Sequence, residues 1–279
     1  MQVTYYGYNA LKYISLGSIG AGILAILFSI FNTSSWLLML GLVFGAMFVF
    51  SGIYFYYALG WCVDPYKLRQ FYKTFLDEVA AIWDGYGRVL DIGTGLGPIA
   101  IKIAKRFPNA QVYGVDTWSK GWSFMGISKA GAQKNAIVEN VHQRCTFQHG
   151  SALNLPFRDG KFKVVVSALT FHEIRVPDRK VLFREAIRVL APGGILLVCD
   201  PIGGLFLDTY KVNHINELLK EIEKFRMKEV KHKSLKDAGL NLGGLSEIFE
   251  FKEEAIPYRE IPHHSLESAQ LAYVSGKKL

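Results

Sequence analysis

The chain has 279 residues, half of which are hydrophobic, and its formal net charge is +8 at pH 7. This length allows one sizeable α/β domain with a smaller appendage. The basic balance suits an anionic membrane surface or nucleic acid. The sequence contains no RGG tract, zinc-ligand spacing or basic run interleaved with aromatics, so we expect no nucleic-acid partner. The three cysteines are far apart and form no CxxC pair, so we expect neither a disulfide scaffold nor a bound metal.

Residues 13–63 contain no Asp, Glu, Lys or Arg. Two apolar runs within them, residues 13–31 and 36–61, each reach the length of about 20 residues that a helix needs to cross a bilayer. A short polar turn, NTSS, separates the runs, so the sequence predicts a transmembrane helical hairpin in residues 1–63 and a second domain in residues 64–279. The long second run disfavours a cleaved signal peptide, and the length of the uncharged stretch disfavours a buried core hairpin.

The residues that flank the two runs predict the orientation of the hairpin. Lys12 precedes the first run, and three basic residues follow the second, namely Lys67, Arg69 and Lys73. Because positive flanks face the cytoplasm, we expect a two-span protein of the cell membrane with both termini and the larger domain in the cytoplasm. The runs also carry small residues that let two helices approach closely, either within the hairpin or between two copies in a homodimer. These residues are Gly17, Ser18, Ala21 and Gly22 in the first run and the GxxxG pair Gly41 and Gly45 in the second.

Strand-like and helix-like segments alternate beyond the hairpin. Helices are expected at 64–83, 97–107, 123–139 and 178–190, and strands at 88–93, 110–116, 145–152, 162–169, 193–200 and 271–279. This alternation predicts an α/β fold with a doubly wound parallel sheet covered by helices on both faces. Ligands of such sheets bind at the carboxyl ends of the strands. Within residues 208–239, the apolar residues from Ile215 to Phe225 have helical spacing, and this helix is expected to pack on the sheet, to cover the substrate or to rest on anionic lipid.

The stretch RVLDIGTGLGPIA, residues 88–100, places three glycines between a strand and a helix. It fits neither the dinucleotide fingerprint GxGxxG nor the phosphate-binding loop GxxxxGK[ST]. With Asp91 two residues before the first glycine, it resembles motif I, [D/E]xGxGxG, of the class I S-adenosylmethionine (SAM) methyltransferases. The resemblance implies that the main chain of the glycines lies against the amino-acid and ribose part of SAM. It also implies that Asp91 binds the ammonium group.

Two further segments match this family in the same order. Asp116 lies 19 residues beyond Gly97, at the end of the second strand, where the family binds both ribose hydroxyls with an acidic residue. The alternative for a carboxylate at this place is a helix N-cap. HGSALNLPF, residues 149–157, resembles the adenine motif GDAxxLPF, although Ser151 stands where the family has Asp, and we interpret His149 as structural.

The segment REAIRVLAPGGILLVCD, residues 184–200, resembles the E..RVLKPGG signature of the subgroup that methylates ubiquinone and menaquinone precursors. Together the matches cover residues 86–200 and imply a Rossmann-like class I methyltransferase sheet with SAM as cofactor. The cofactor-binding residues implied by the resemblance are Asp91, Gly93, Thr94, Gly95, Gly97, Asp116, Thr117, Trp118, Ser151, Ala152 and Leu169.

The segment SALTFHEI after the fourth strand faces the transferred methyl group in this fold. His172 and Glu173 are therefore the candidate catalytic residues, which take a proton or orient the acceptor. The alternative is that this pair caps a helix or meets the core. A carbon acceptor such as a quinone ring favours such a base, whereas an amine acceptor favours aromatic walls. The candidate walls are Trp118, Trp122 and Phe171, and His263 and His264 are interpreted as surface residues.

The sequence thus predicts a membrane-anchored SAM-dependent methyltransferase with a lipophilic or small-molecule acceptor, such as a quinone-like ring or a lipid headgroup. One alternative is a protein that senses SAM without turnover, and another is a tethered methyltransferase of a soluble small molecule. Methylation of DNA or of protein amides is disfavoured because SALT stands where an [ND]PP[YFW] tetrad would be.

Overall fold

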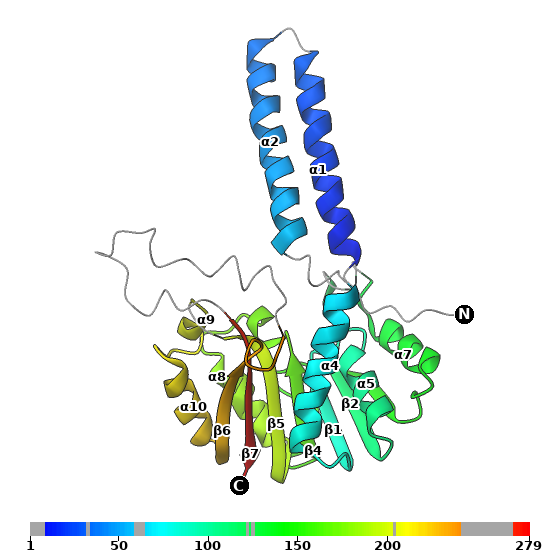
Figure 1. Cartoon of the computed structure of the whole chain (residues 1–279), viewed down its shortest axis with the longest axis vertical. Coiled ribbons are helices and arrows are strands. Elements are labelled where there is room, and N and C mark those ends of the chain that lie inside the picture. The colour runs from blue at the N-terminus through cyan, green and yellow to red at the C-terminus, as the bar shows by residue number, and fades with distance from the viewer. Residues whose placement is uncertain are drawn as a thin grey trace. The chain divides into compact units, whose positions relative to one another are not determined.

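The computed structural model describes residues 9–31, 34–58, 65–120, 123, 126–202, 205–240 and 270–279 (Figure 1). The chain divides into two compact units. One unit contains the helices α1 (Asn9–Ile30) and α2 (Ser35–Ala58), and the other contains a seven-stranded sheet with its helices.

The first unit is a helical hairpin. Its segments Tyr13–Ile30 and Ser35–Tyr54 are long and apolar enough to cross a membrane by length and composition, with mean hydropathies of 2.0 and 2.2. The small residues of the two helices face each other. A Cβ atom on Gly22 would lie 2.6 Å from the carbonyl oxygen of Gly45, and one on Gly45 would lie 2.8 Å from the carbonyl oxygen of Gly22. The hydroxyl of Ser18 also donates a hydrogen bond to the carbonyl of Phe48 over 3.0 Å. Packing within the hairpin therefore accounts for Ser18, Gly22, Gly41 and Gly45, whereas Gly17 and Ala21 are exposed.

The second unit confirms the predicted α/β fold. Its strands are β1 (Gly87–Ile92), β2 (Ala110–Asp116), β3 (Cys145–His149), β4 (Phe162–Ala168), β5 (Leu190–Ile202), β6 (Met227–Ser234) and β7 (Gln270–Lys278). They lie in the order β3-β2-β1-β4-β5-β7-β6, and β7 pairs antiparallel with both of its neighbours while β1 to β5 pair in parallel. The direction of winding reverses between β1 and β4. The carboxyl ends of these two strands are therefore where this kind of sheet binds its ligand.

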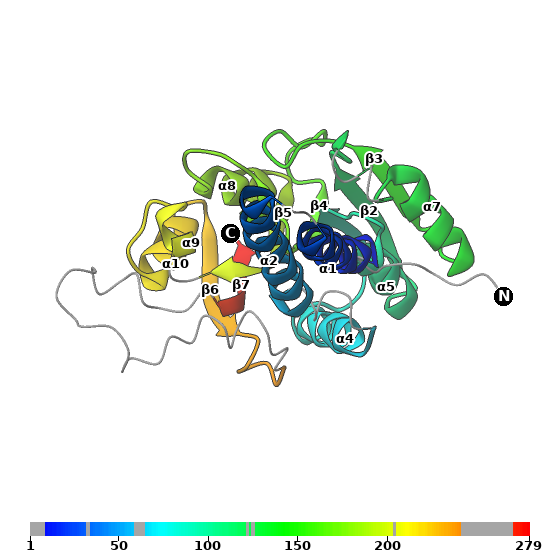
Figure 2. The same ribbon diagram turned by 90° about the horizontal axis from the view of Figure 1, so that it is seen from above.

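Helices cover both faces of the sheet (Figure 2). They are α4 (Pro65–Ile82), α5 (Pro98–Arg106), α7 (Lys129–Val138), α8 (Lys180–Arg188), α9 (Leu205–Asp208) and α10 (Ile215–Glu223). Buried residues of α8 and α10 belong to one core cluster, which includes Val274 of β7. The next side chain along β7 toward its start, Tyr273, packs against Phe75 of α4 with 6.0 Å between ring centroids. Because successive residues of a strand point to opposite faces, α4 covers the face opposite α8 and α10.

The predicted helix 123–139 is interrupted, since Ser123 is helical but residues 126–128 are not, and α7 begins at Lys129. Gly126 has a φ of +83°, a left-handed conformation that interrupts a helix. Ser128 is extended, and its hydroxyl accepts a hydrogen bond from the backbone N–H of Gly131, which makes it the N-cap.

The helix expected within residues 208–239 is confirmed as α10, but a strand follows it. The segment contains α10 and then β6, which lies at the edge of the sheet and was not predicted. Most side chains of β6 are Lys, Glu or His, as is typical of an edge strand protected against further pairing. A register shift between Lys228 and Lys231 breaks the alternation of its side chains. The strand therefore has neither the apolar content nor the period of two by which a strand is recognised.

Candidate active site

The glycine loop runs from the end of β1 to the start of α5. Gly93, Gly95 and Gly97 have φ angles of +73°, +53° and +79°, all in the left-handed region that favours glycine. The backbone N–H groups of Gly93 and Thr94 donate to the carbonyl of Val115 over 2.8 and 3.1 Å. The loop is thereby tied to the end of the neighbouring strand β2.

Asp91 braces this loop from inside the protein. Its side chain is buried, and Oδ2 accepts hydrogen bonds from the hydroxyl of Thr94 (2.7 Å) and from the backbone N–H of Ala100 (3.2 Å). Burial raises the pKa of Asp91 to about 7, although both hydrogen bonds act in the opposite direction. The side chain of Thr94 therefore faces Asp91 in the interior, so that only the backbone of Thr94 can contact a ligand.

Asp116 connects β2 to the middle of the glycine loop. Its Oδ2 accepts the backbone N–H of Gly95 (2.9 Å), and its Oδ1 accepts the backbone N–H of Trp118 (2.8 Å). The indole N–H of Trp118 donates to the carbonyl of Gly95 (2.9 Å). Trp118 has a φ of +39°, which is strained for a bulky residue, and Thr117 between them is exposed. The structure thus brings Gly95, Asp116 and Trp118 together.

The segment that resembles the adenine motif follows β3 next to Asp116. The backbone N–H of Gly150 donates to the backbone carbonyl of Asp116 (3.0 Å). The hydroxyl of Ser151 accepts the backbone N–H of Leu153 (3.2 Å), and Ala152 is buried in the core cluster. Ser151 is half-buried. It lies in a tight turn just beyond the carboxyl end of β3.

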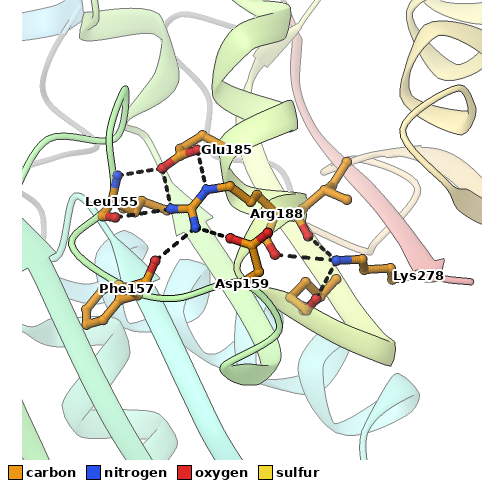
Figure 3. Close-up of polar contacts among 8 residues, drawn as sticks. Leu155, Phe157, Asp159, Glu185, Arg188 and Lys278 are labelled. Carbon is orange, nitrogen blue, oxygen red and sulfur yellow. Dashed lines mark hydrogen bonds and ion pairs between the residues drawn. The ribbon is translucent and has the colours of Figure 1, made fainter.

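Two residues of the signature segment hold the adenine-motif turn in place (Figure 3). The guanidinium of Arg188 donates to the carbonyls of Leu155 (3.1 Å) and Phe157 (2.9 Å). Glu185 accepts the backbone N–H of Leu155 over 2.7 Å and also pairs with Arg188 over 2.7 Å. Lys278 of β7 donates to two carbonyls beside Arg188, those of Ile187 (2.8 Å) and Leu190 (2.7 Å). Glu185 and Arg188 were not predicted as site residues, although the signature that contains them signals their importance.

We expect the variant Arg188→Lys to loosen this turn, because a lysine cannot reproduce the planar fork that reaches both carbonyls. The backbone N–H of Leu155 should exchange with deuterium about tenfold faster or more, since hydrogen bonds to charged groups contribute about 1.5–3 kcal/mol. Hydrogen exchange of the full chain measures this rate. Arg158→Lys is the matched control, because Arg158 is exposed in the same turn. Equal exchange rates in the two variants would contradict the conclusion that Arg188 holds this turn in place.

The end of β4 touches the glycine loop directly. The hydroxyls of Ser167 and Thr170 both donate to the carbonyl of Ile92, over 3.0 and 3.3 Å. Between them, Leu169 has a φ of +55° and donates its N–H to the carbonyl of Cys199 (2.8 Å). Such strain in a residue other than glycine is typical of functional sites. The ends of β1 and β4 therefore form one connected structure at the switch point.

The two predicted catalytic residues lie in a short 3-10 helix, η1 (Phe171–Glu173), and each contacts the other. Nε2 of His172 lies 3.2 Å from Oε1 of Glu173. Nδ1 of His172 lies 2.9 Å from Oδ1 of Asp200, which is fully buried at β5. Burial alone would lower the pKa of His172, but the hydrogen bonds to Asp200 and Glu173 outweigh burial and raise it to about 9.

Asp200 is a site residue that the sequence interpretation missed. Burial raises its pKa, and hydrogen bonds from His172 act against this increase. The available signal was its position, because Asp200 ends an apolar strand segment in the same way as Asp91 and Asp116. Trp122, His263 and His264, which the sequence interpretation singled out, lie outside the described residues. Within the part of the chain that the structure describes, no group of three or more His, Cys, Asp and Glu could hold a metal ion.

The comparisons with known proteins identify the domain. A family model described as a methyltransferase domain matches residues 89–194. This match, together with the relatives below, supports a class I SAM-dependent methyltransferase. The demethylmenaquinone methyltransferase of Thermus thermophilus is 36% identical over 128 residues, which cover 45% of this chain and 53% of that protein. The norajmaline N-methyltransferase of Rauvolfia serpentina is 32% identical over 110 residues, which cover 39% of this chain and 34% of that protein. The chain thus spans about half or less of the length of these relatives.

Solved structures confirm the fold of the methyltransferase domain. The geranyl diphosphate C-methyltransferase from Streptomyces coelicolor A3(2), crystallised with S-adenosyl-L-homocysteine, superposes with a TM-score of 0.54. It is 15% identical, and the match covers 76% of this chain and 81% of that one. At this identity the likeness concerns the fold alone. The resemblance to class I methyltransferases that the sequence motifs indicated is confirmed.

Proposed function

We propose that the chain is a membrane-anchored methyltransferase that transfers the methyl group of SAM to a lipophilic acceptor. The observation that carries the proposal is the set of contacts at the switch point. The glycine loop is bonded on one side to Val115 and Asp116 of β2, and it lies on the other side against Thr170, next to His172. The family match over this same region supports a methyl-transfer reaction.

The residues present fit SAM. The backbone of Gly93, Gly95 and Gly97 would lie along its amino-acid and ribose part, and the carboxylate of Asp116 would accept the ribose hydroxyls. Since Oδ2 of Asp91 is engaged by Thr94 and Ala100, the ammonium group would meet Oδ1. Ser151 and Ala152 would border the adenine, and Thr117, Trp118 and Leu169 would complete the contacts. When bound, SAM supplies a methyl group already activated on a sulfonium, so the domain has to align the acceptor and exclude water.

The helical hairpin supports membrane anchoring. Most large apolar side chains of α1 and α2 are exposed, for example Phe28 (71%) and Phe50 (74%). Helices that are apolar on all sides are either buried in protein or span a membrane. We propose that residues 13–31 and 36–61 span the cell membrane with the methyltransferase domain in the cytoplasm. Anchoring would raise the local concentration of a lipid-soluble acceptor at the site.

We propose a quinone-like ring or a lipid headgroup as the acceptor. Several relatives are named demethylmenaquinone methyltransferases, which supports the ring. The predicted aromatic walls for an amine acceptor find less support. Phe171 is fully buried and packs against Phe183, with 5.3 Å between ring centroids, and the indole N–H of Trp118 is bonded to the glycine loop.

The experiment that tests the proposal uses the full chain in detergent, SAM with a radioactive methyl group, and a lipid extract of the source membrane. We expect the label to enter the organic phase, and the lipid product to gain the mass of one CH2 group. Label found only in water-soluble products would favour a soluble acceptor. SAM binding without any release of S-adenosylhomocysteine would instead favour a sensor without turnover.

A further inference from the structure

The backbone and one ring nitrogen of His172 are held by two buried charged side chains. Asp200 accepts the backbone N–H of His172 through Oδ2 (2.7 Å) and faces the ring nitrogen Nδ1 through Oδ1 (2.9 Å). On the other side, Nη2 of Arg179 donates to the backbone carbonyl of His172. Both charged side chains are almost completely buried, at 0% and 8% exposed. The ring of His172 is therefore held in a single orientation.

Arg179 is itself fixed by contacts outside η1. Its Nε donates to the carbonyl of Ile174 (3.2 Å), and its Nη1 donates to the hydroxyl of Thr209 (2.8 Å). Its backbone N–H also donates to the carbonyl of Thr209 (2.9 Å). Arg179 thus connects η1 to the segment between α9 and α10. Two charged side chains that are almost completely buried, Asp200 and Arg179, therefore converge on one histidine.

The second ring nitrogen of His172 has a different environment. Nε2 faces Glu173, whose side chain is 51% exposed, whereas that of His172 is 22% exposed. A partly exposed carboxylate can leave this position at little cost, because a contact of this kind contributes about 0–1 kcal/mol. The geometry therefore combines a fixed ring with an exchangeable oxygen ligand at Nε2.

We propose that Asp200 and Arg179 are positioning residues for His172. When the methyl acceptor binds, its ionisable hydroxyl replaces the carboxylate of Glu173 at Nε2 of His172. This inference rests on the proposed function and narrows its acceptor to a molecule with a phenol-type or enol-type hydroxyl. The narrowing follows from the oxygen at Nε2, since a hydroxyl oxygen can replace a carboxylate oxygen there. A fully substituted amine has no proton to give to this nitrogen.

The proton step can be written in full. In the chain without acceptor, both ring nitrogens face carboxylates, so the doubly protonated ring is favoured. When a neutral hydroxyl replaces Glu173, one carboxylate is lost and the ring can release its Nε2 proton to water. The O–H bond of the acceptor then breaks, an Nε2–H bond forms, and the electron pair stays on the acceptor oxygen. The oxygen, or a carbon conjugated to it, becomes the nucleophile, and Asp200 stabilises the resulting imidazolium.

Nitrogen NMR of the full chain in detergent, with labelled histidine, tests the proposal. The signal of His172 is assigned by its loss in His172→Gln. We expect Asp200→Asn to lower the pKa of His172 by about one to two pH units, because the carboxylate that favours the imidazolium is gone. Glu173→Gln should lower it less. Glu223→Gln is the matched control, since Glu223 is an exposed glutamate at the end of α10 and should leave the pKa unchanged.

The acceptor class is tested with two probes that differ only in the hydroxyl, 1-naphthol and 1-methoxynaphthalene. We expect 1-naphthol to shift the Nε2 signal of His172, more strongly in Glu173→Gln, and the methyl ether to leave it in place. If Asp200→Asn does not fold, Glu173→Gln and the two probes still test whether a hydroxyl replaces Glu173 at Nε2 of His172. Calorimetry with SAM separates the two levels of the argument. If the wild-type chain does not bind SAM, the proposed function is overturned. SAM binding combined with a His172 signal that responds to neither 1-naphthol nor Glu173→Gln would overturn only this inference.

Discussion

Replacing Gly93 by alanine is expected to lower the affinity for SAM at least a hundredfold. The added Cβ atom would lie on the side chain of Thr170, only 2.6 Å from its Cβ atom. Thr170 cannot move away easily, because its hydroxyl lies within hydrogen-bond distance of the carbonyls of Ile92 (3.3 Å) and Ala168 (3.1 Å). The φ of +73° at Gly93 adds strain for any residue with a Cβ atom. Either the glycine loop or the end of β4 has to shift, and each carries part of the proposed SAM site.

A matched control separates steric overlap from backbone strain. Gly193 has a φ of +70°, but a Cβ atom there would meet nothing within 4 Å. Gly193→Ala should therefore lose only the strain energy of about 1–3 kcal/mol in folding stability and keep its SAM affinity. Calorimetry measures the affinity, and thermal unfolding measures the stability. If both alanine variants bound SAM as tightly as the wild type, the loop 93–97 would not be the cofactor site.

The parts of the site that the sequence could predict are local in the chain. The three glycines of the loop lie within five residues, and the left-handed φ of each explains why glycine is favoured at these positions. Asp91 and Asp116 end apolar runs, which is visible from hydropathy alone. In these cases the motif and the structural requirement occupy the same short segment, so a single sequence is enough.

The parts that the sequence could not predict depend on contacts between distant segments. The pair of His172 and Asp200 joins residues 28 positions apart, and nothing near Asp200 indicates that its partner is a histidine. Arg179 resembles any basic residue before a helix until its contacts to η1 are known. The strand β6 has a polar edge sequence whose strand character comes from pairing with β7. Tertiary pairing, which local patterns do not encode, decides each of these three cases.

The variant Asp116→Ala is expected to weaken SAM binding about a hundredfold or more. The carboxylate would accept two ribose hydroxyls, and each hydrogen bond to a charged group contributes about 1.5–3 kcal/mol, while 1.4 kcal/mol corresponds to a factor of ten. The variant also removes the acceptor for the backbone N–H of Gly95, so the glycine loop loses its bond to β2 at this point. Asp116→Asn keeps one acceptor oxygen and should lose less affinity than Asp116→Ala.

The control for the local turn is Asp84→Ala. Oδ1 of Asp84 accepts the backbone N–H of Tyr86 (3.1 Å), two residues on, as Oδ1 of Asp116 accepts that of Trp118. The two aspartates therefore make the same type of local turn at two different places in the chain. Asp84, however, has no bond to the glycine loop among the described contacts. Unchanged affinity in Asp84→Ala together with a large loss in Asp116→Ala would assign the effect to the ribose contacts and the Gly95 bond. Equal, small losses in both variants would mean that Asp116 only stabilises its turn, and SAM would then have to be held by the glycine backbone and the Ser151 turn alone.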